Sequence, residues 1–314
     1  MKAIGHSGFG GPEVLHEIEL PDPVPGPGQL RIRVRAAAVS PTDTLRRAGL
    51  RAEEMREEER PYVPGMEVAG VLEEIGPGTT TDLRAGDHVM GVLFPRGSRG
   101  AYSEQIVLPA ESVVRTPAGV DDVAASTVPM NGLTARMALD ELALKPGQTL
   151  GVTGAAGTYG GYVVQLAKAE GLRVVADAAD KDRALVEKLG ADVVVRRGDD
   201  VADRFLEVAP AGVDGLADGA VLNEKVVRAV RPGGRLVTVR HFEREPVNGV
   251  TFHPVRVRYY VRERAKLDRL RELVEQGALT PRVAGTYPAA QAGEAHRRLA
   301  QGGTRGRLVL TFGE

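Results

Sequence analysis

A glycine-rich turn is the clearest chemical signal in this chain of 314 residues. Residues 154–160 read Gly-Ala-Ala-Gly-Thr-Tyr-Gly and lie between the apolar run 149–152 and the helical apolar pattern of 162–167. This order predicts a strand, a tight turn and a helix. In a parallel sheet, such a turn lets the backbone approach a pyrophosphate, which then lies at the positive N-terminal end of the helix. The alternative is a turn whose small residues serve only close packing.

The stretch that follows the turn alternates short apolar runs with helical patterns. Strands are predicted at 173–177, 191–195, 213–217 and 235–239, and helices at 184–189, 201–208 and 222–230. Strands separated by helices imply right-handed crossovers and a parallel sheet covered on both faces. Ligands bind such a sheet at the carboxyl ends of its strands, where the glycine turn falls. The context therefore favours a dinucleotide. Its pyrophosphate is expected on Gly154, Ala155, Ala156, Gly157, Thr158, Tyr159 and Gly160.

The composition excludes several other classes of protein. The 41 Lys and Arg residues nearly balance 42 Asp and Glu, so nothing indicates a nucleic-acid or anionic-membrane partner. No apolar run approaches the roughly 18 residues that span a bilayer, and the first residues lack the apolar core of a signal peptide. We therefore expect a cytoplasmic protein. The absence of cysteine excludes disulfides, thiolate nucleophiles and zinc sites built on sulfur.

The chain before the glycine turn is organised differently. Residues 29–35 alternate apolar side chains with arginines, which predicts a strand with one exposed face; an anion site is the alternative. Short runs punctuated by Gly and Pro continue to residue 104 and suggest a small barrel-like β domain. The charged segment 51–60 predicts a solvated loop or short helix, with a lid over a cleft as the alternative.

Several motifs, taken in chain order, carry a resemblance to a known family. They lie at residues 64–70, 76–78, 86–89, 132–135 and 154–169, and a last match follows at 305–310. In this order they resemble the medium-chain dehydrogenase/reductase superfamily, and within it the zinc-free quinone oxidoreductase branch, which includes the zeta-crystallins. The resemblance implies an α/β fold in which a Rossmann doubly wound parallel sheet is inserted into a β-rich GroES-like substrate domain.

The resemblance also implies how the chain is divided. The substrate domain is expected at residues 1–121 and 252–314, and the dinucleotide-binding domain at 122–251, with nicotinamide and substrate between them. We expect the acceptor pocket to be built by the loops 50–62 and 243–260. Residues 250–260 predict an exposed edge strand with Pro254 at a bulge or register break. In the family this edge joins two subunits, so a homodimer is expected.

The chain departs from the zinc-dependent members of the superfamily at three positions. Ser40 and Met130 stand where those enzymes have cysteines, and Met66 stands where they have a histidine. None of the three is a good Zn²⁺ ligand, so no metal site is expected. Without a Lewis acid, hydride addition to a conjugated acceptor is favoured over simple alcohol oxidation.

The candidate catalytic residues are Asn131, Ser40 and Asp43. The resemblance places Asn131 near the nicotinamide, where its amide can donate to a substrate carbonyl as charge develops there; a helix cap is the alternative. Ser40 replaces the family's usual Asn, and Ser40 with Asp43 also predicts a helix start. Leu45 and Arg51 occupy the positions of the family's tyrosines, which removes a tyrosine proton donor from this helix.

Other residues are expected at the cofactor. The resemblance places Thr134, Gly219, Val239, Arg240 and His241 by the nicotinamide and its ribose. An acid near the end of the second strand, Asp177, suits the ribose hydroxyls of NADH. Cations nearby suit the 2′-phosphate of NADPH or form an ordinary solvated surface: Lys181, Arg183, Arg196 and Arg197. Because the last of these matches a position beside the adenosine in quinone reductases, we favour NADPH, with NADH as the alternative.

The sequence therefore predicts an NADPH-dependent reductase of a small-molecule quinone or α,β-unsaturated carbonyl. A related alternative is an enoyl reductase that tailors a polyketide-like metabolite. A nucleotide-binding, crystallin-like protein without turnover is the alternative from another class, since fold does not determine function.

Overall fold

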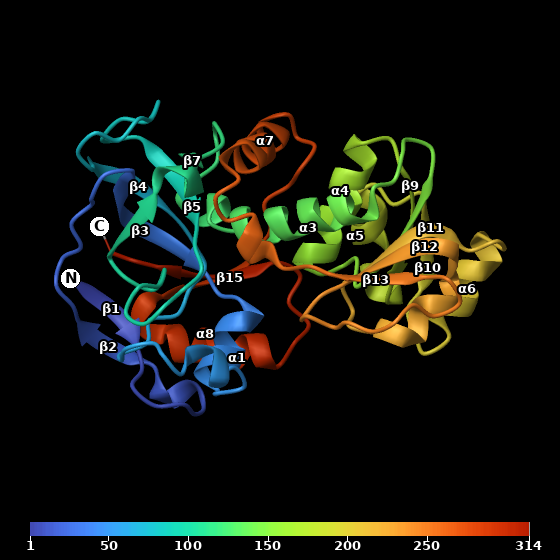
Figure 1. The fold of residues 1–314 in the computed structure, drawn as a ribbon, viewed down its shortest axis with the longest axis horizontal. Helices are drawn as coiled ribbons and strands as arrows, with labels where there is room; N and C mark the ends of the chain where they lie inside the picture. Colours follow the sequence, from blue (N-terminus) through green and yellow to red (C-terminus); the bar gives the residue numbers. More distant parts are fainter. Residues whose placement is uncertain (314) are drawn as a thin grey trace. The chain divides into compact units, whose positions relative to one another are not determined.

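The computed structural model describes residues 1–313, which form two compact units (Figure 1). Unit 1 comprises Met1–Met130, Arg258–Glu275 and the described residues from Pro281 onward. Unit 2 comprises Asn131–Val257 and Gln276–Thr280. The long segment of unit 2 thus begins nine residues after the predicted start at 122 and ends six after the predicted end at 251.

Unit 2 is built on a six-stranded sheet in which every strand is parallel to its neighbours, in the order β10-β9-β8-β11-β12-β13. The strands are β8 (Thr149–Thr153), β9 (Arg173–Ala178), β10 (Val193–Arg196), β11 (Val213–Asp218), β12 (Val230–Thr238) and β13 (Thr251–Pro254). The helices are α3 (Pro129–Leu142), α4 (Thr158–Ala169), α5 (Arg183–Lys188) and α6 (Val201–Val208). Helices α4 and α6 lie on opposite faces of the sheet (Figure 1). The predicted doubly wound sheet is confirmed.

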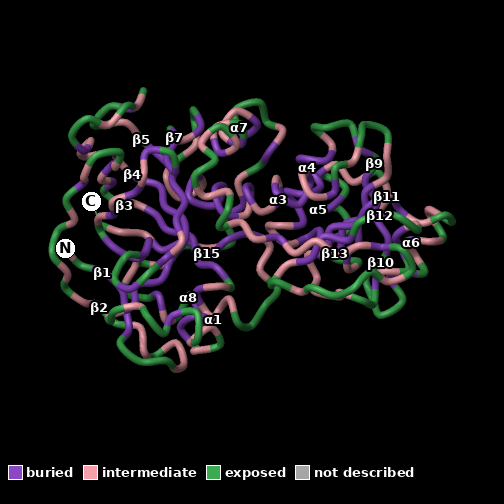
Figure 2. The backbone as a smooth tube through the Cα atoms, in the orientation of Figure 1, coloured by how far each residue is buried: buried purple, intermediate pink, exposed green. Residues whose placement is uncertain are grey.

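The sheet of unit 2 is buried on both faces (Figure 2), as continuous apolar strands require. Phe205 of α6 is fully buried and belongs to one apolar cluster with Leu216 and Leu236 of the central strands. Burying one such side chain stabilises a fold by about 1.5–3 kcal/mol. This packing holds the carboxyl ends of the strands in place.

Two predicted elements of unit 2 are wrong in type or extent. Residues 222–230 form a 3-10 helix at Asn223–Ala229 and then the start of β12, not an α-helix. The predicted edge strand 250–260 ends at Pro254, in continuous register with β12 and without a bulge, and a 3-10 helix follows at Val257–Tyr259. Proline has no N–H to extend the ladder, so the strand stops there.

Unit 1 is a β-rich unit made from both ends of the chain, as expected. Its large sheet has the order β14-β15-β3-β4-β5-β7, and β6 also pairs with β3. The strands are β3 (Gln29–Ala38), β4 (Glu67–Ile75), β5 (His88–Val92), β6 (Gln105–Pro109), β7 (Val113–Arg115), β14 (Val283–Pro288) and β15 (Arg307–Thr311). β15 pairs antiparallel with β3 and so joins the two ends of the sequence. A separate hairpin pairs β1 (Lys2–Gly5) with β2 (His16–Glu19).

The helices of unit 1 are α1 (Pro41–Arg47), α2 (Asp122–Ala125), α7 (Arg264–Glu275) and α8 (Ala292–Ala300). The arginines of β3 lie on its exposed face, where Arg31 and Arg33 pair with Glu73 and Arg31 also pairs with Glu74 on β4. Arg35 donates instead to the carbonyl of Gly313, so these contacts favour an exposed strand surface over an anion site. The segment 51–60 contains a short 3-10 helix, Glu53–Met55, and turns.

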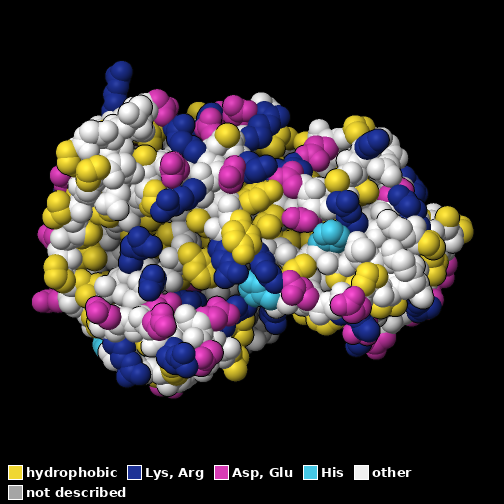
Figure 3. Space-filling model, viewed as in Figure 1, with side chains coloured by type: hydrophobic (Ala, Val, Ile, Leu, Met, Phe, Trp, Pro, Cys, Tyr) yellow, Lys and Arg dark blue, Asp and Glu magenta, His cyan; other side chains and the backbone are white. Residues whose placement is uncertain are grey.

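Cationic and acidic side chains are interspersed over the visible surface (Figure 3), in agreement with the formal net charge of −1. None of the helices in the described chain combines the length and the apolar character that a bilayer crossing requires.

Candidate functional site

The glycine turn joins β8 to α4 at the carboxyl edge of the unit 2 sheet, as predicted. Gly154 has a left-handed φ of +68°, and a Cβ there would lie 2.8 Å from the backbone of Gly219. A Cβ at Gly160 would clash with the backbone of Gly154. These two glycines are therefore needed by the fold itself. Gly157 differs, because its φ is −71° and an added Cβ would meet only the carbonyl oxygen of Gly154, at 3.2 Å.

Gly157 is also the N-cap of α4, and no side chain caps this helix end. The first N–H groups of a 12-residue helix therefore face the turn with their partial positive charge. Backbone donors beside a residue without a side chain form a cradle that fits a pyrophosphate.

Asp177, on β9, holds the glycine turn in shape. Its Oδ1 accepts a hydrogen bond from the N–H of Gly154 at 2.6 Å and a longer one from Ala155 at 3.4 Å. The side chain is only 4% exposed, and burial raises its pKa above the ordinary value for aspartate. The sequence placed this acid correctly at the end of the second strand, but its contact with the turn could not be read from the spacing.

A second buried aspartate, Asp218, organises the end of β11. It accepts hydrogen bonds from the hydroxyl of Thr153 at 2.6 Å and from the N–H of Asn223 at 2.6 Å. Tyr159 lies in the first turn of α4. Burial raises the pKa of its hydroxyl, and the nearby charge of Asp218 raises it further. The Tyr159 hydroxyl and the Asn223 Oδ1 are buried and have no hydrogen-bond partner within residues 1–313. Buried polar atoms without a partner are expected at a ligand site, because the ligand supplies the missing hydrogen bonds.

Backbone strain gathers at the same edge. Left-handed φ angles occur after β8 at Gly154 (+68°), after β11 at Val221 (+59°) and Asn223 (+54°), and after β12 at Arg240 (+61°) and His241 (+62°). For residues other than glycine this conformation costs about 1–2 kcal/mol each. These three strands are neighbours in the sheet, so the strain concentrates around one site, as it does at ligand sites.

Four of the five residues predicted beside the nicotinamide lie at this edge of the sheet, and the fifth, Thr134, lies on α3. Gly219 follows β11, donates its N–H to the carbonyl of Thr153 at 3.0 Å, and lies against the ring of Tyr159. Val239, Arg240 and His241 follow β12 in a loop that the Thr238 hydroxyl closes by donating to the carbonyl of Phe242 at 2.6 Å.

The predicted phosphate-binding cations lie at the ends of β9 and β10. Arg197 is exposed, and its charge reaches Asp177. Lys181 is exposed too, and no carboxylate pairs with either cation among the described residues. Arg196, by contrast, lies 3.8 Å from Asp180, and Arg183 pairs with Glu187.

In unit 1, Ser40 and Asp43 form a capping box at the start of α1. The Ser40 hydroxyl accepts from the N–H of Thr42 at 3.3 Å, and Asp43 Oδ2 accepts from the N–H of Ser40 at 2.8 Å. Asp43 is fully buried, and it also accepts from the N–H of Gly65 and the hydroxyl of Tyr102. Burial raises its pKa. The helix-start interpretation of these residues is therefore confirmed.

The three positions that the resemblance matches to zinc ligands hold buried, uncharged side chains. Met66 and Met130 are buried, and Ser40 caps α1. Within the described residues, no group of three or more His, Asp and Glu side chains is arranged to hold a metal ion. The donor set therefore does not fit Zn²⁺.

Asn131 and Thr134 lie in the first turns of α3. Asn131 is the third residue of this helix, inside it and not at its cap, so the capping alternative is wrong. Both side chains are partly exposed.

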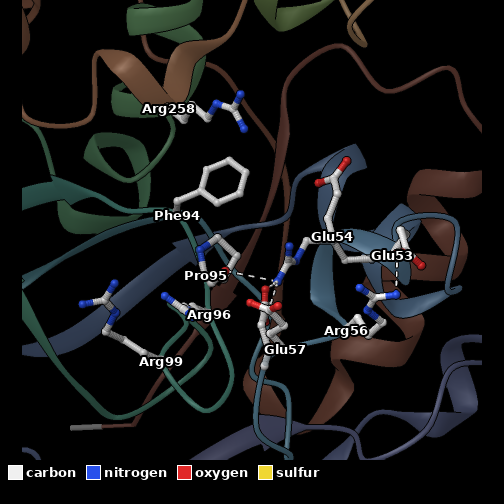
Figure 4. Close-up of a pocket in the computed structure, with 11 residues that line it drawn as sticks. Glu53, Glu54, Arg56, Glu57, Phe94, Pro95, Arg96, Arg99 and Arg258 are labelled. Atoms are coloured by element: carbon white, nitrogen blue, oxygen red, sulfur yellow. Dashed lines mark hydrogen bonds and ion pairs between the residues drawn. The ribbon is translucent and has the colours of Figure 1, made fainter.

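Unit 1 also contains a pocket of about 540 Å³ (Figure 4). It is lined by Arg46 of α1, side chains of the segments 53–58 and 94–99, and Arg258. The volume suits a small molecule. The lining residues 53–58 and Arg258 lie in the loops 50–62 and 243–260, which are expected to build the acceptor pocket.

Sequence reasoning missed a buried ionisable cluster in unit 1. Glu67 is fully buried, forms an ion pair with Arg307 at 2.5 Å, and accepts from the N–H of Met130 at 2.8 Å. Burial raises the pKa of Glu67 to about 7. Tyr102 lies 3.1 Å from His296, whose pKa burial lowers to about 3. The one available signal was Glu67 itself, a charged residue directly before the apolar residues Val68 and Ala69 of β4.

Known proteins share both parts of this organisation. Residues 26–118 match the alcohol dehydrogenase GroES-like domain, and residues 189–310 match the zinc-binding dehydrogenases. The quinone oxidoreductase of Pseudomonas aeruginosa is 31% identical, with 98% of this chain and 99% of that protein covered. The chain belongs to the medium-chain dehydrogenase/reductase superfamily, in its quinone oxidoreductase branch. It is an oxidoreductase of that family and binds a nicotinamide dinucleotide.

Two further comparisons bear on chemistry. A 2-haloacrylate reductase from a Burkholderia species is 31% identical over 85% of this chain and 86% of its own length. A mycobacterial protein solved in complex with NADPH has a TM-score of 0.85 at 29% identity and covers 99% of this chain and 100% of its own.

Proposed function

We propose that the protein is an NADPH-dependent reductase that adds hydride to a quinone or to the β-carbon of an α,β-unsaturated carbonyl, without zinc. The observation that carries the proposal is an intact dinucleotide cradle combined with Ser40, Met66 and Met130 at the positions where zinc ligands would stand. Because no Lewis acid activates the acceptor, the electron sink has to be the conjugated system of the acceptor itself.

The residues of this chain have distinct roles in the proposed reaction. The turn from Gly154 to Gly160 holds the pyrophosphate, and Lys181 with Arg197 bind the 2′-phosphate. Thr134, Gly219 and the loop from Val239 to His241 border the nicotinamide and its ribose. These assignments are supported by the helix end without a side-chain cap, by the orphaned hydroxyl of Tyr159, and by two exposed cations that have no carboxylate partner in the described part of the chain.

When bound, NADPH supplies the hydride. The β-carbon of the acceptor takes it with two electrons, negative charge develops on the carbonyl oxygen, and the α-carbon takes a proton from water. We assign Asn131 as the amide donor to that oxygen. Ser40 and Asp43 act as positioning residues, because their polar groups are already used in the capping box.

The relatives support this choice of acceptor. Two relatives are named for conjugated acceptors, a quinone and a 2-haloacrylate. A third similar protein was solved in complex with NADPH. We further propose a cytoplasmic homodimer.

The test is a comparison of two acceptors that differ only in conjugation. Purified protein should oxidise NADPH with cyclohexenone and not with its saturated counterpart cyclohexanone, and a chelator should leave the rate unchanged. Reduction of cyclohexanone that stops on chelation would indicate a zinc-dependent alcohol dehydrogenase instead.

A further inference from the structure

The pocket of unit 1 carries more positive charge than its own carboxylates neutralise. Arg46 is buried, and its Nη2 lies 2.9 Å from both carboxylate oxygens of Glu58. Arg56 pairs with Glu53 at 3.1 Å. Three other lining cations have no carboxylate within ion-pair distance among the described residues: Arg96, Arg99 and Arg258. Against them stands one lining acid without a cation partner in the same part of the chain, Glu57.

The buried pair fixes the walls of this pocket relative to each other. Arg46 Nη2 also donates to the carbonyl of Pro95 at 3.1 Å, and Glu58 Oε2 accepts from the N–H of Gly97 at 2.8 Å. These bonds connect α1, the segment 53–58 and the segment 94–99. The pocket is therefore held open before any ligand arrives, which lowers the ordering cost of binding.

The charges are separated across the pocket. In Figure 4, Arg96, Arg99 and Arg258 lie on the side of Phe94, while Glu53 and Glu54 lie on the opposite side. Phe94 offers a flat ring between the unpaired cations, and the Arg46 guanidinium lies 6.0 Å from the centroid of that ring. A planar anion can thus stack on an apolar surface while arginines surround its charge.

We propose that this pocket binds the carboxylate of a planar conjugated acid, and hence that α,β-unsaturated acids are the substrate class of the enzyme. This substrate class rests on the proposed reductase function. A guanidinium group matches a carboxylate with two parallel hydrogen bonds, and an anion offsets the positive charge of the three arginines that line the pocket without a carboxylate partner among the described residues. A neutral enone gains only the stacking contact.

The test compares cinnamate with methyl cinnamate by calorimetry on the full chain without NADPH. We expect one cinnamate per chain, bound at least about 10-fold more tightly than the ester, because only the acid forms charge-assisted contacts. Replacing Arg96, Arg99 and Arg258 together by glutamine should bring the ratio of the two affinities to about 1. The matched control is Arg269→Gln on α7, which removes an exposed arginine paired with Glu272 and should keep the ratio.

If the triple variant does not fold, a single substitution tests the same proposal. Arg258→Gln alone changes one exposed side chain at the 3-10 helix after β13, and it should reduce the ratio by about 3-fold. Equal affinity of acid and ester in the unaltered protein would overturn the proposal. So would inorganic phosphate that displaces cinnamate at equal concentration, since the site would then bind anions without regard to the conjugated carboxylate.

Binding is measured here without turnover, which separates the two proposals. A protein that binds cinnamate as expected but reduces only neutral enones contradicts the substrate class. A protein that binds it and oxidises no NADPH with any acceptor contradicts the reductase function instead.

Discussion

At the scale of single residues, the glycines of the turn have different roles: some are required by the fold, and one is proposed to leave space for the pyrophosphate. Gly154 and Gly160 are required by backbone packing, whereas a Cβ added at Gly157 would meet one atom, the carbonyl oxygen of Gly154 at 3.2 Å, which has to move by a few tenths of an ångström. The pattern of glycines located the turn, but this division depends on interatomic distances that no spacing encodes. The same is true of Asp177, whose carboxylate is directed at the turn by the local backbone.

Gly157→Val should therefore separate binding from folding. The added side chain would occupy the space beside the helix end and weaken NADPH binding about 100-fold or more, while thermal unfolding changes little. Calorimetry measures the affinity. Gly8→Val is the control, since a Cβ there meets nothing within 4 Å, and it should bind NADPH normally. If Gly157→Val binds NADPH with unchanged affinity, the pyrophosphate does not lie at this turn.

Arg197 is the residue that we propose selects NADPH over NADH. Arg197→Ala should weaken NADPH about 10-fold and NADH less than about 2-fold, because only NADPH loses a charge-assisted contact to phosphate. Arg196→Ala is the control, since Arg196 lies by Asp180. Equal weakening of both dinucleotides, or a native preference for NADH, would return the selecting role to Asp177.

At the scale of elements, the alternation of strands and helices in unit 2 was predictable, because parallel strands buried on both faces leave continuous apolar runs. The misassigned pieces, 222–230 and 250–260, are short and lie where tertiary packing and Pro254 override local preference. In unit 1, Glu67 of β4 and Arg307 of β15 form a buried pair past the intervening strand β3. Contacts between strands so distant in sequence leave no local signal.

This pair predicts a pH dependence of stability. Burial raises the pKa of Glu67 from 4.5 to about 7, so the folded state binds more protons than the unfolded state between these values. The contribution of Glu67 is present below pH 4.5 and is lost as the pH rises through about 7, by an amount of about 3 kcal/mol. The free energy of unfolding of the native protein minus that of Glu67→Gln should fall accordingly, as measured by urea unfolding.

The control for this experiment is Glu74→Gln, which replaces an exposed partner of Arg31 on the same strand and leaves Glu67 in place, so this variant should retain the loss of stability that Glu67 causes. A flat difference for Glu67→Gln would mean that Glu67 is ionised throughout this range, held by Arg307.

At the scale of the whole molecule, the family resemblance gave the α/β class and the construction of unit 1 from both chain ends, and both are confirmed. The assembly is a proposal. The edge strand β13 has four residues, and the N–H of Val255 donates to the carbonyl of Thr238 on β12. The backbone groups that point away from β12 are therefore those of Phe252 and Pro254. The edge is shorter than predicted, and its proline offers no donor to a partner.

Light scattering tests the homodimer directly. At micromolar concentration we expect twice the chain mass of 33.4 kDa. A mass of one chain would show that a four-residue edge is too short to pair with a second copy.

The central claim is hydride addition to a conjugated carbon, and one labelling measurement tests it most directly. The protein is incubated with cyclohexenone and NADPH that carries deuterium at its transferable position, and the product is analysed by NMR. We expect cyclohexanone with one deuterium on the former β-carbon. Deuterium on the carbonyl carbon of an allylic alcohol, or a product without deuterium, would contradict it.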